Sequence, residues 1–118
     1  MASNPLKENT AFWGREINRY IDLLGLKNWE TWISLPEHLE GDRALTHRQP
    51  EARIAEFRVD VDWLRGATKK QISICAAHEV LHILLAQLYW LADKSNIMSE
   101  EQLAAIEHDI VRSLEKII

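Results

Sequence analysis

Residues 69–93 read KKQISICAAHEVLHILLAQLYWLAD, and this stretch decides the fold. Its apolar residues are interrupted by few polar ones and by no proline or glycine. Gly66 marks a break before the stretch. Thr68 follows, with Gln71 three residues later, which is a capping box in which each side chain accepts a hydrogen bond from the backbone N–H of the other residue. We therefore predict one long central helix over residues 69–93.

This central helix resembles a membrane span in composition, because residues 72–92 are almost continuously apolar and long enough to cross a bilayer. The segment nevertheless contains His78, Glu79 and His82 on adjacent faces. An acidic or basic group at the centre of a spanning helix costs roughly 2.5–3.5 kcal/mol. We therefore predict a buried core helix and no association with a membrane.

Two further helices are predicted on either side of the central one. Aromatic and aliphatic residues recur at helical spacing over residues 9–24, and Gly25 is placed to end that helix. Ser99 and Gln102 repeat the capping box ahead of a last helix over residues 100–117.

Strands are predicted between the first helix and the central one, over residues 29–35, 44–48 and 53–61. The third has the clearest signal, since apolar and mostly polar side chains alternate along it with a period of two. Helix, strands, helix, helix is an α+β pattern, with a small, about three-stranded and mainly antiparallel sheet. No repeat or linker divides the chain, so residues 1–118 are interpreted as a single domain.

The composition narrows the function. With 47% hydrophobic and 27% charged residues and a net charge of −4, the chain is globular and has no long basic run, which argues against a nucleic-acid partner. Cys75 is the only cysteine, which excludes an internal disulfide and a cysteine-rich zinc site. A reducing cytoplasm is the expected compartment, because residues 1–7 also lack the apolar core of a secretory signal.

Within the central helix, His78 and His82 are four residues apart, which places both imidazoles on one face, one turn from each other. Two such imidazoles can reach one zinc ion at the usual distance of about 2.0–2.1 Å. Glu79 lies beside that position, where the general base for a metal-bound water has to sit. It is also the only charged residue, histidines aside, over residues 72–91, and such a carboxylate needs a partner. The alternative is two core histidines hydrogen-bonded to the backbone or to Glu79.

Zinc needs a third protein ligand and an open position for water. Glu107 shares a helical face with Leu103, Ile110 and Leu114, which is the face expected to pack inward, so its carboxylate is the candidate. Otherwise Glu107 is a solvated residue at the rim of that face. His108 lies about 100° further round the helix. It is the alternative ligand, or a donor to a developing oxyanion.

The motif His78-Glu79-x-x-His82, followed by Glu107 on a later helix, resembles the gluzincin pattern of zinc peptidases. More narrowly, residues 29–118 resemble minimal gluzincin-like or SprT-like domains, of the kind found in small phage and prophage proteins. The resemblance implies a zincin-like fold, zinc held by the two histidines and Glu107, and water activated by Glu79. Gluzincins often add a Tyr or His that stabilises the transition state, for which the candidates here are His108, Tyr89 and His47.

These features together predict a zinc-dependent metallopeptidase that acts on a peptide or protein substrate. The strand over residues 53–61 is expected to offer an edge along which an extended peptide pairs its backbone. The alternative function is a catalytically silent module, stabilised by zinc, that binds a phage or host protein, for example in phage assembly.

Overall fold

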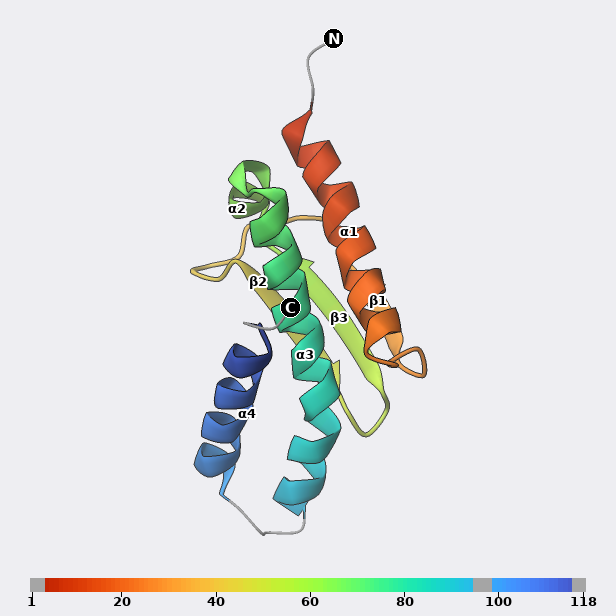
Figure 1. Ribbon diagram of the computed structural model, residues 1–118, viewed down its shortest axis with the longest axis vertical. Helices are drawn as coiled ribbons and strands as arrows, with labels where there is room; N and C mark the ends of the chain where they lie inside the picture. The colour runs from red at the N-terminus through yellow and green to blue at the C-terminus, as the bar shows by residue number, and fades with distance from the viewer. Residues whose placement is uncertain (1–3, 95–98, 116–118) are drawn as a thin grey trace.

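The computed structural model describes residues 4–94 and 99–115, which form helices packed against a small sheet (Figure 1). The elements are, in order, α1 (Pro5–Leu23), β1 (Glu30–Ile33), β2 (Ala44–Gln49), β3 (Ile54–Val59), α2 (Val61–Gly66), α3 (Lys69–Lys94) and α4 (Glu100–Glu115). The predicted α+β class, N-terminal helix and three strands are confirmed.

The first helix, α1, begins earlier than the predicted residue 9, because Asn4 and Pro5 start it. The Asn4 side chain accepts a hydrogen bond from the Lys7 backbone N–H, and proline suits the first helical turn. Gly25 ends the helix as expected, with a φ of +71° that favours glycine.

The three strands form a mixed sheet in the order β1-β3-β2. β3 pairs antiparallel with β2 but parallel with β1. The prediction of a mainly antiparallel sheet therefore holds for one of the two strand pairs. β3 lies in the centre, and the prediction of an edge strand over residues 53–61 is therefore wrong. Alternating burial shows that one face of a strand is covered, but it carries no information on how many neighbours the strand has. The edge strand nearest α3 is β2.

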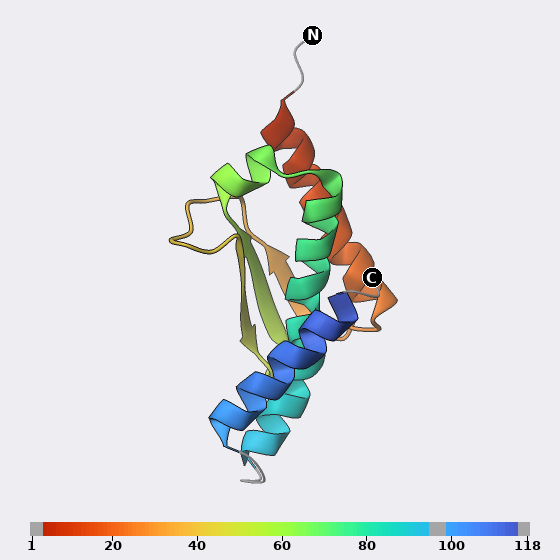
Figure 2. The same cartoon turned by 60° about the vertical axis from the view of Figure 1, so that its left-hand side comes forward.

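The core lies between the sheet and the helices α1 and α3, which occupy the same side of the sheet (Figures 1 and 2). Fully buried side chains from all these elements form one cluster, among them Trp13, Ile17, Phe57, Ile72 and Val80. α4 returns beside the second half of α3 (Figure 1). This packing fixes α3 between β2 and α4, which is what positions the candidate site.

Both predicted capping boxes are confirmed. At the start of α3, the Gln71 backbone N–H donates to the Thr68 hydroxyl at 3.1 Å and the Thr68 backbone N–H donates to the Gln71 side-chain oxygen Oε1 at 2.9 Å. Ser99 and Gln102 do the same at the start of α4. The end of the last predicted helix, residues 116–117, lies outside the described residues. None of the described helices combines the length and the apolar character that crossing a bilayer requires.

The short helix α2 was not predicted from the sequence. Asp60 begins it by accepting a hydrogen bond from the Trp63 backbone N–H at 2.9 Å. The predicted third strand ran through this turn, because Val61 continues the apolar alternation. The cap at Asp60 ends the strand at Val59 instead.

Candidate functional site

The middle of α3 brings three possible metal-binding side chains together. His78, Glu79 and His82 each place one ligand atom within 4.8 Å of the other two. The two imidazole rings lie edge to face, with their centroids 4.9 Å apart. The i, i+4 spacing thus has the consequence expected from the sequence, with both imidazoles on one side of the helix.

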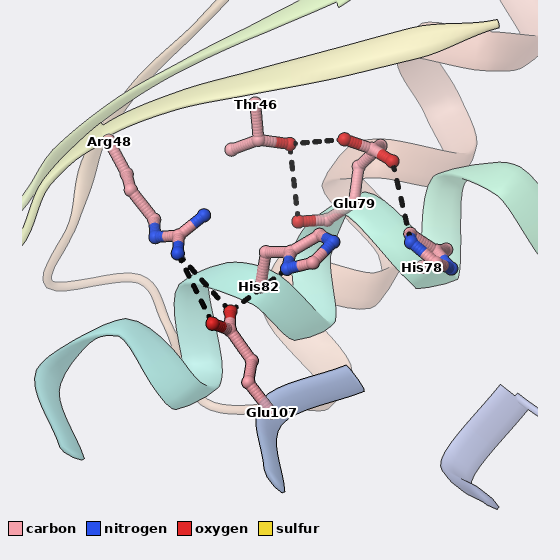
Figure 3. Close-up of polar contacts among 6 residues, drawn as sticks. All are labelled: Thr46, Arg48, His78, Glu79, His82 and Glu107. Atoms are coloured by element: carbon pink, nitrogen blue, oxygen red, sulfur yellow. Dashed lines mark hydrogen bonds and ion pairs between the residues drawn. The ribbon is translucent and has the colours of Figure 1, made fainter. Parts of the chain in front are cut away.

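Glu79 is the buried carboxylate of this group, with 7% of its surface exposed. The Thr46 hydroxyl on β2 donates to its Oε1 at 2.8 Å, and also lies 3.4 Å from the Glu79 backbone oxygen (Figure 3). The other carboxylate oxygen, Oε2, lies 4.0 Å from His78 Nε2. The partner that a buried carboxylate requires is therefore supplied by the edge strand, and one oxygen remains directed towards His78.

We expect Thr46 to position the Glu79 carboxylate. Replacing Thr46 by Val removes the hydroxyl at nearly constant volume and leaves Oε1 without its donor. For a buried acceptor this lowers the free energy of unfolding by about 1–3 kcal/mol, and it leaves the Glu79 carboxylate without the contact that fixes its position. The expected result is roughly a tenfold fall in kcat of the peptidase activity proposed below, with an unchanged zinc content. Thr46→Ser keeps the hydroxyl and should restore the rate. A Thr46→Val variant as active as the unaltered protein would contradict this role.

Glu107 is the second buried carboxylate, with 8% of its surface exposed, so it is not a solvated residue at the rim of α4. Its Oε1 lies 3.0 Å from His82 Nδ1. From β2, Arg48 Nη2 donates to Oε1 at 3.2 Å and to Oε2 at 3.4 Å (Figure 3). Burial raises the pKa of Glu107, but the bond with His82 and the charge of Arg48 outweigh it, and the pKa lies below its usual value.

The contact between His82 and Glu107 fits a zinc site in two ways. Two atoms bound to one tetrahedral zinc at about 2.0–2.1 Å are about 3.3 Å apart, close to the 3.0 Å between Nδ1 and Oε1. Alternatively, Nδ1–H donates to the carboxylate and leaves Nε2 for the metal, the usual partnership of a ligating histidine. In the first arrangement the two imidazoles and the Glu107 carboxylate form a donor set that suits zinc. In the second, Glu107 orients His82 and is not itself a ligand.

The candidates for a residue that stabilises the transition state lie at different places. His108 is exposed on α4, with its ring centroid 6.3 Å from that of His82. Tyr89 and His47 line a hollow of about 600 Å³ that also borders Thr46 and Arg48. His108 therefore has a ring contact with one of the two imidazoles.

Two hollows lie between β2 and α3, at opposite ends of the site. The first, of about 350 Å³, is lined by His78 and Glu79 themselves, together with Ala44 and Cys75. The second is the hollow of about 600 Å³, and Thr46 and Arg48 form part of its wall. The candidate site is therefore open along the edge strand on both sides.

Thr46 and Arg48 are the site residues that the sequence analysis missed. They are two apart on β2, so they share its inward face, and each binds one of the buried carboxylates. The available signal was a pair of polar residues on the covered face of a short predicted strand. Their partners lie 33 and 59 residues away in the chain, which no local pattern specifies.

Comparisons with protein-family models, with curated proteins and with solved structures find no match. The geometry of the site is therefore the basis for a function. That geometry comprises two imidazoles and two buried carboxylates from α3 and α4, with Thr46 and Arg48 of β2 bound to the carboxylates.

Proposed function

We propose that the chain is a zinc-dependent metallopeptidase with a zincin-like arrangement of its edge strand and central helix. His78, His82 and Glu107 hold the ion, and Glu79 is the general base. The observation that carries the proposal is the group formed by His78, Glu79 and His82, whose ligand atoms lie within 4.8 Å of one another. Histidines aside, Glu79 is the only charged residue over residues 72–91 of this helix. Burying a charged side chain costs desolvation free energy, and a bound metal with its substrate would interact favourably with that charge.

A zinc ion held by His78, His82 and Glu107 would supply a water whose pKa is lowered towards about 7 and a Lewis acid for the substrate carbonyl. Glu79 is the residue that moves the proton of that water. Its Oε1 is held by the Thr46 hydroxyl at 2.8 Å, so Oε2, on the His78 side, is the oxygen that accepts the proton and passes it to the leaving amine. His108 is the proposed donor to the oxyanion, because its ring lies next to that of His82.

The substrate is an extended peptide that lies along β2. Within the described residues 4–94 and 99–115, this strand pairs with β3 on one side only. Thr46 and Arg48 connect it to the site. Backbone hydrogen bonds to such an edge bind many sequences, and the hollows beside it select among side chains. The exposed His47 and Gln49 keep the bare edge soluble in the absence of substrate.

Zinc content and hydrolysis together test the proposal. Protein purified without chelator should contain about one zinc ion per chain by elemental analysis. Mass spectrometry should show cleavage of a diverse peptide mixture that stops with chelator and returns with added zinc. Zinc bound without cleavage would favour the alternative function, a catalytically silent module that binds a protein partner. A zinc content well below one ion, not recovered on adding zinc, would contradict both.

A further inference from the structure

The larger hollow beside the site combines an apolar wall with carboxylates. It has a volume of about 600 Å³ and lies between β2, the turn that follows it, β3 and the second half of α3. We propose that this hollow, called the Trp90 hollow below, binds an arginine or lysine side chain of the peptide substrate next to the bond that is cleaved. The inference rests on the proposed function and names its substrate class.

The position of the Trp90 hollow relates it to the chemistry. Thr46 and Arg48 line it, and the same two residues bind Glu79 and Glu107. A peptide paired with β2 and carrying its carbonyl at the His78–His82 group therefore places a neighbouring side chain in this hollow. Side chains alternate along an extended strand, so one or two residues separate the occupant from the scissile bond.

The walls of the hollow suit a long side chain with an apolar stem. Pro50, Ile54 and Ala86 are aliphatic, and Tyr89 and Trp90 add two aromatic rings from α3. Aromatic rings also attract a guanidinium or ammonium group, by about 0.5–2 kcal/mol depending on its exposure to water. An arginine side chain meets both requirements.

The charge on the walls selects a cation. Arg48 is bound by Glu107, at 3.2 and 3.4 Å, so its guanidinium is directed towards α4 (Figure 3). Glu51 and Glu56 also line the hollow, and within residues 4–94 and 99–115 neither forms an ion pair. Glu56 accepts a hydrogen bond from the Ser34 hydroxyl, which does not neutralise it.

Arg58 is the cation that most nearly competes for Glu56, because it lies on the same face of β3. Its guanidinium is bound by Glu37, and Glu56 contributes only a smaller part of the rise in the Arg58 pKa. His47 is the cross-strand neighbour of Glu56 and lines the hollow as well.

The test uses peptides that differ at one residue and measures binding apart from hydrolysis. Zinc-loaded Glu79→Gln protein is titrated by calorimetry at pH 7.5 with peptides that carry arginine, citrulline or norleucine. Citrulline has almost the shape of arginine without the charge. We expect the arginine peptide to bind about tenfold more tightly than the citrulline peptide, because only arginine carries a charge that the carboxylates lining the hollow attract.

Added to that protein, Glu51→Gln and Glu56→Gln should each reduce the arginine preference about threefold, and both together should remove it. Glu40→Gln is the matched control, because Glu40 is exposed and is not among the residues that line the hollow. Glu51 lies in an exposed turn, so its variant is expected to fold even if loss of the Ser34 contact weakens the Glu56 variant. Thermal unfolding measurements show whether the Glu51→Gln and Glu56→Gln variants are folded.

Equal binding of the arginine and citrulline peptides would overturn the inference, as would a preference that the double variant retains. The two proposals fail separately. Cleavage by the unaltered protein with no preference for basic residues refutes the proposed role of the Trp90 hollow and leaves the peptidase function standing. A charge-dependent arginine preference without any cleavage refutes the peptidase and leaves a binding site for basic peptides.

Discussion

Replacing Glu79 by Gln should abolish peptide hydrolysis and leave zinc bound. The amide keeps the shape of the carboxylate, and its oxygen can still accept the Thr46 hydrogen bond that is 2.8 Å long in the structure. It has no basic oxygen, so the proton of the attacking water has no acceptor at Oε2. Loss of a general base lowers the rate by about 10²–10⁴-fold. Peptide cleavage assays and elemental analysis of the same preparation measure the two quantities.

Glu101→Gln is the control for this substitution, because it makes the same change at an exposed position in the first turn of α4. It should leave both the rate and the zinc content unchanged. Undiminished hydrolysis in Glu79→Gln would refute the role of Glu79. Loss of zinc from that variant would show instead that Glu79 is a ligand, which its place in the group of three also permits.

The parts of the fold that follow from local sequence were predicted closely. α3 begins at Lys69 as expected, because the Thr68–Gln71 capping box depends only on residues three apart. The position of His78 relative to His82 is equally local, since it follows from the helical repeat. Glu107 was placed inward from the apolar positions on its own helix, and the structure shows it buried.

The parts that depend on distant segments were not predicted. β3 has the clearest alternation of apolar and polar residues. Its central place in the sheet depends on β1 and β2 lying on opposite sides of it, which the alternation does not specify. The contacts of Thr46 and Arg48 with the buried carboxylates likewise depend on how β2 meets α3 and α4. The pattern of residues in one sequence shows which face of a helix or strand is apolar. It does not show which other helix or strand packs against that face.

The zinc affinity should depend on α4 as well as on α3. His82→Ala removes an imidazole, and Glu107→Gln removes the charge of the carboxylate that lies 3.0 Å from it. If Glu107 is the third ligand, we expect both variants to lower the zinc affinity by more than about 100-fold, because partners that only support a ligand are worth about 10- to 100-fold. Competition with a chromophoric chelator measures the affinity, and Glu101→Gln is again the matched control on α4.

The size of the Glu107→Gln effect distinguishes the two arrangements of the His82–Glu107 contact. A loss of about 10- to 100-fold, clearly smaller than that of His82→Ala, would mean that Glu107 only orients the imidazole through Nδ1. Arg48→Met separates charge balance from ligation, because Arg48 binds the same carboxylate at 3.2 Å and has no place in the donor set. It should strengthen zinc binding if Glu107 is a ligand, since a carboxylate released from a competing cation is a better donor. Unchanged affinity in both Glu107→Gln and Arg48→Met would exclude α4 from the metal site altogether.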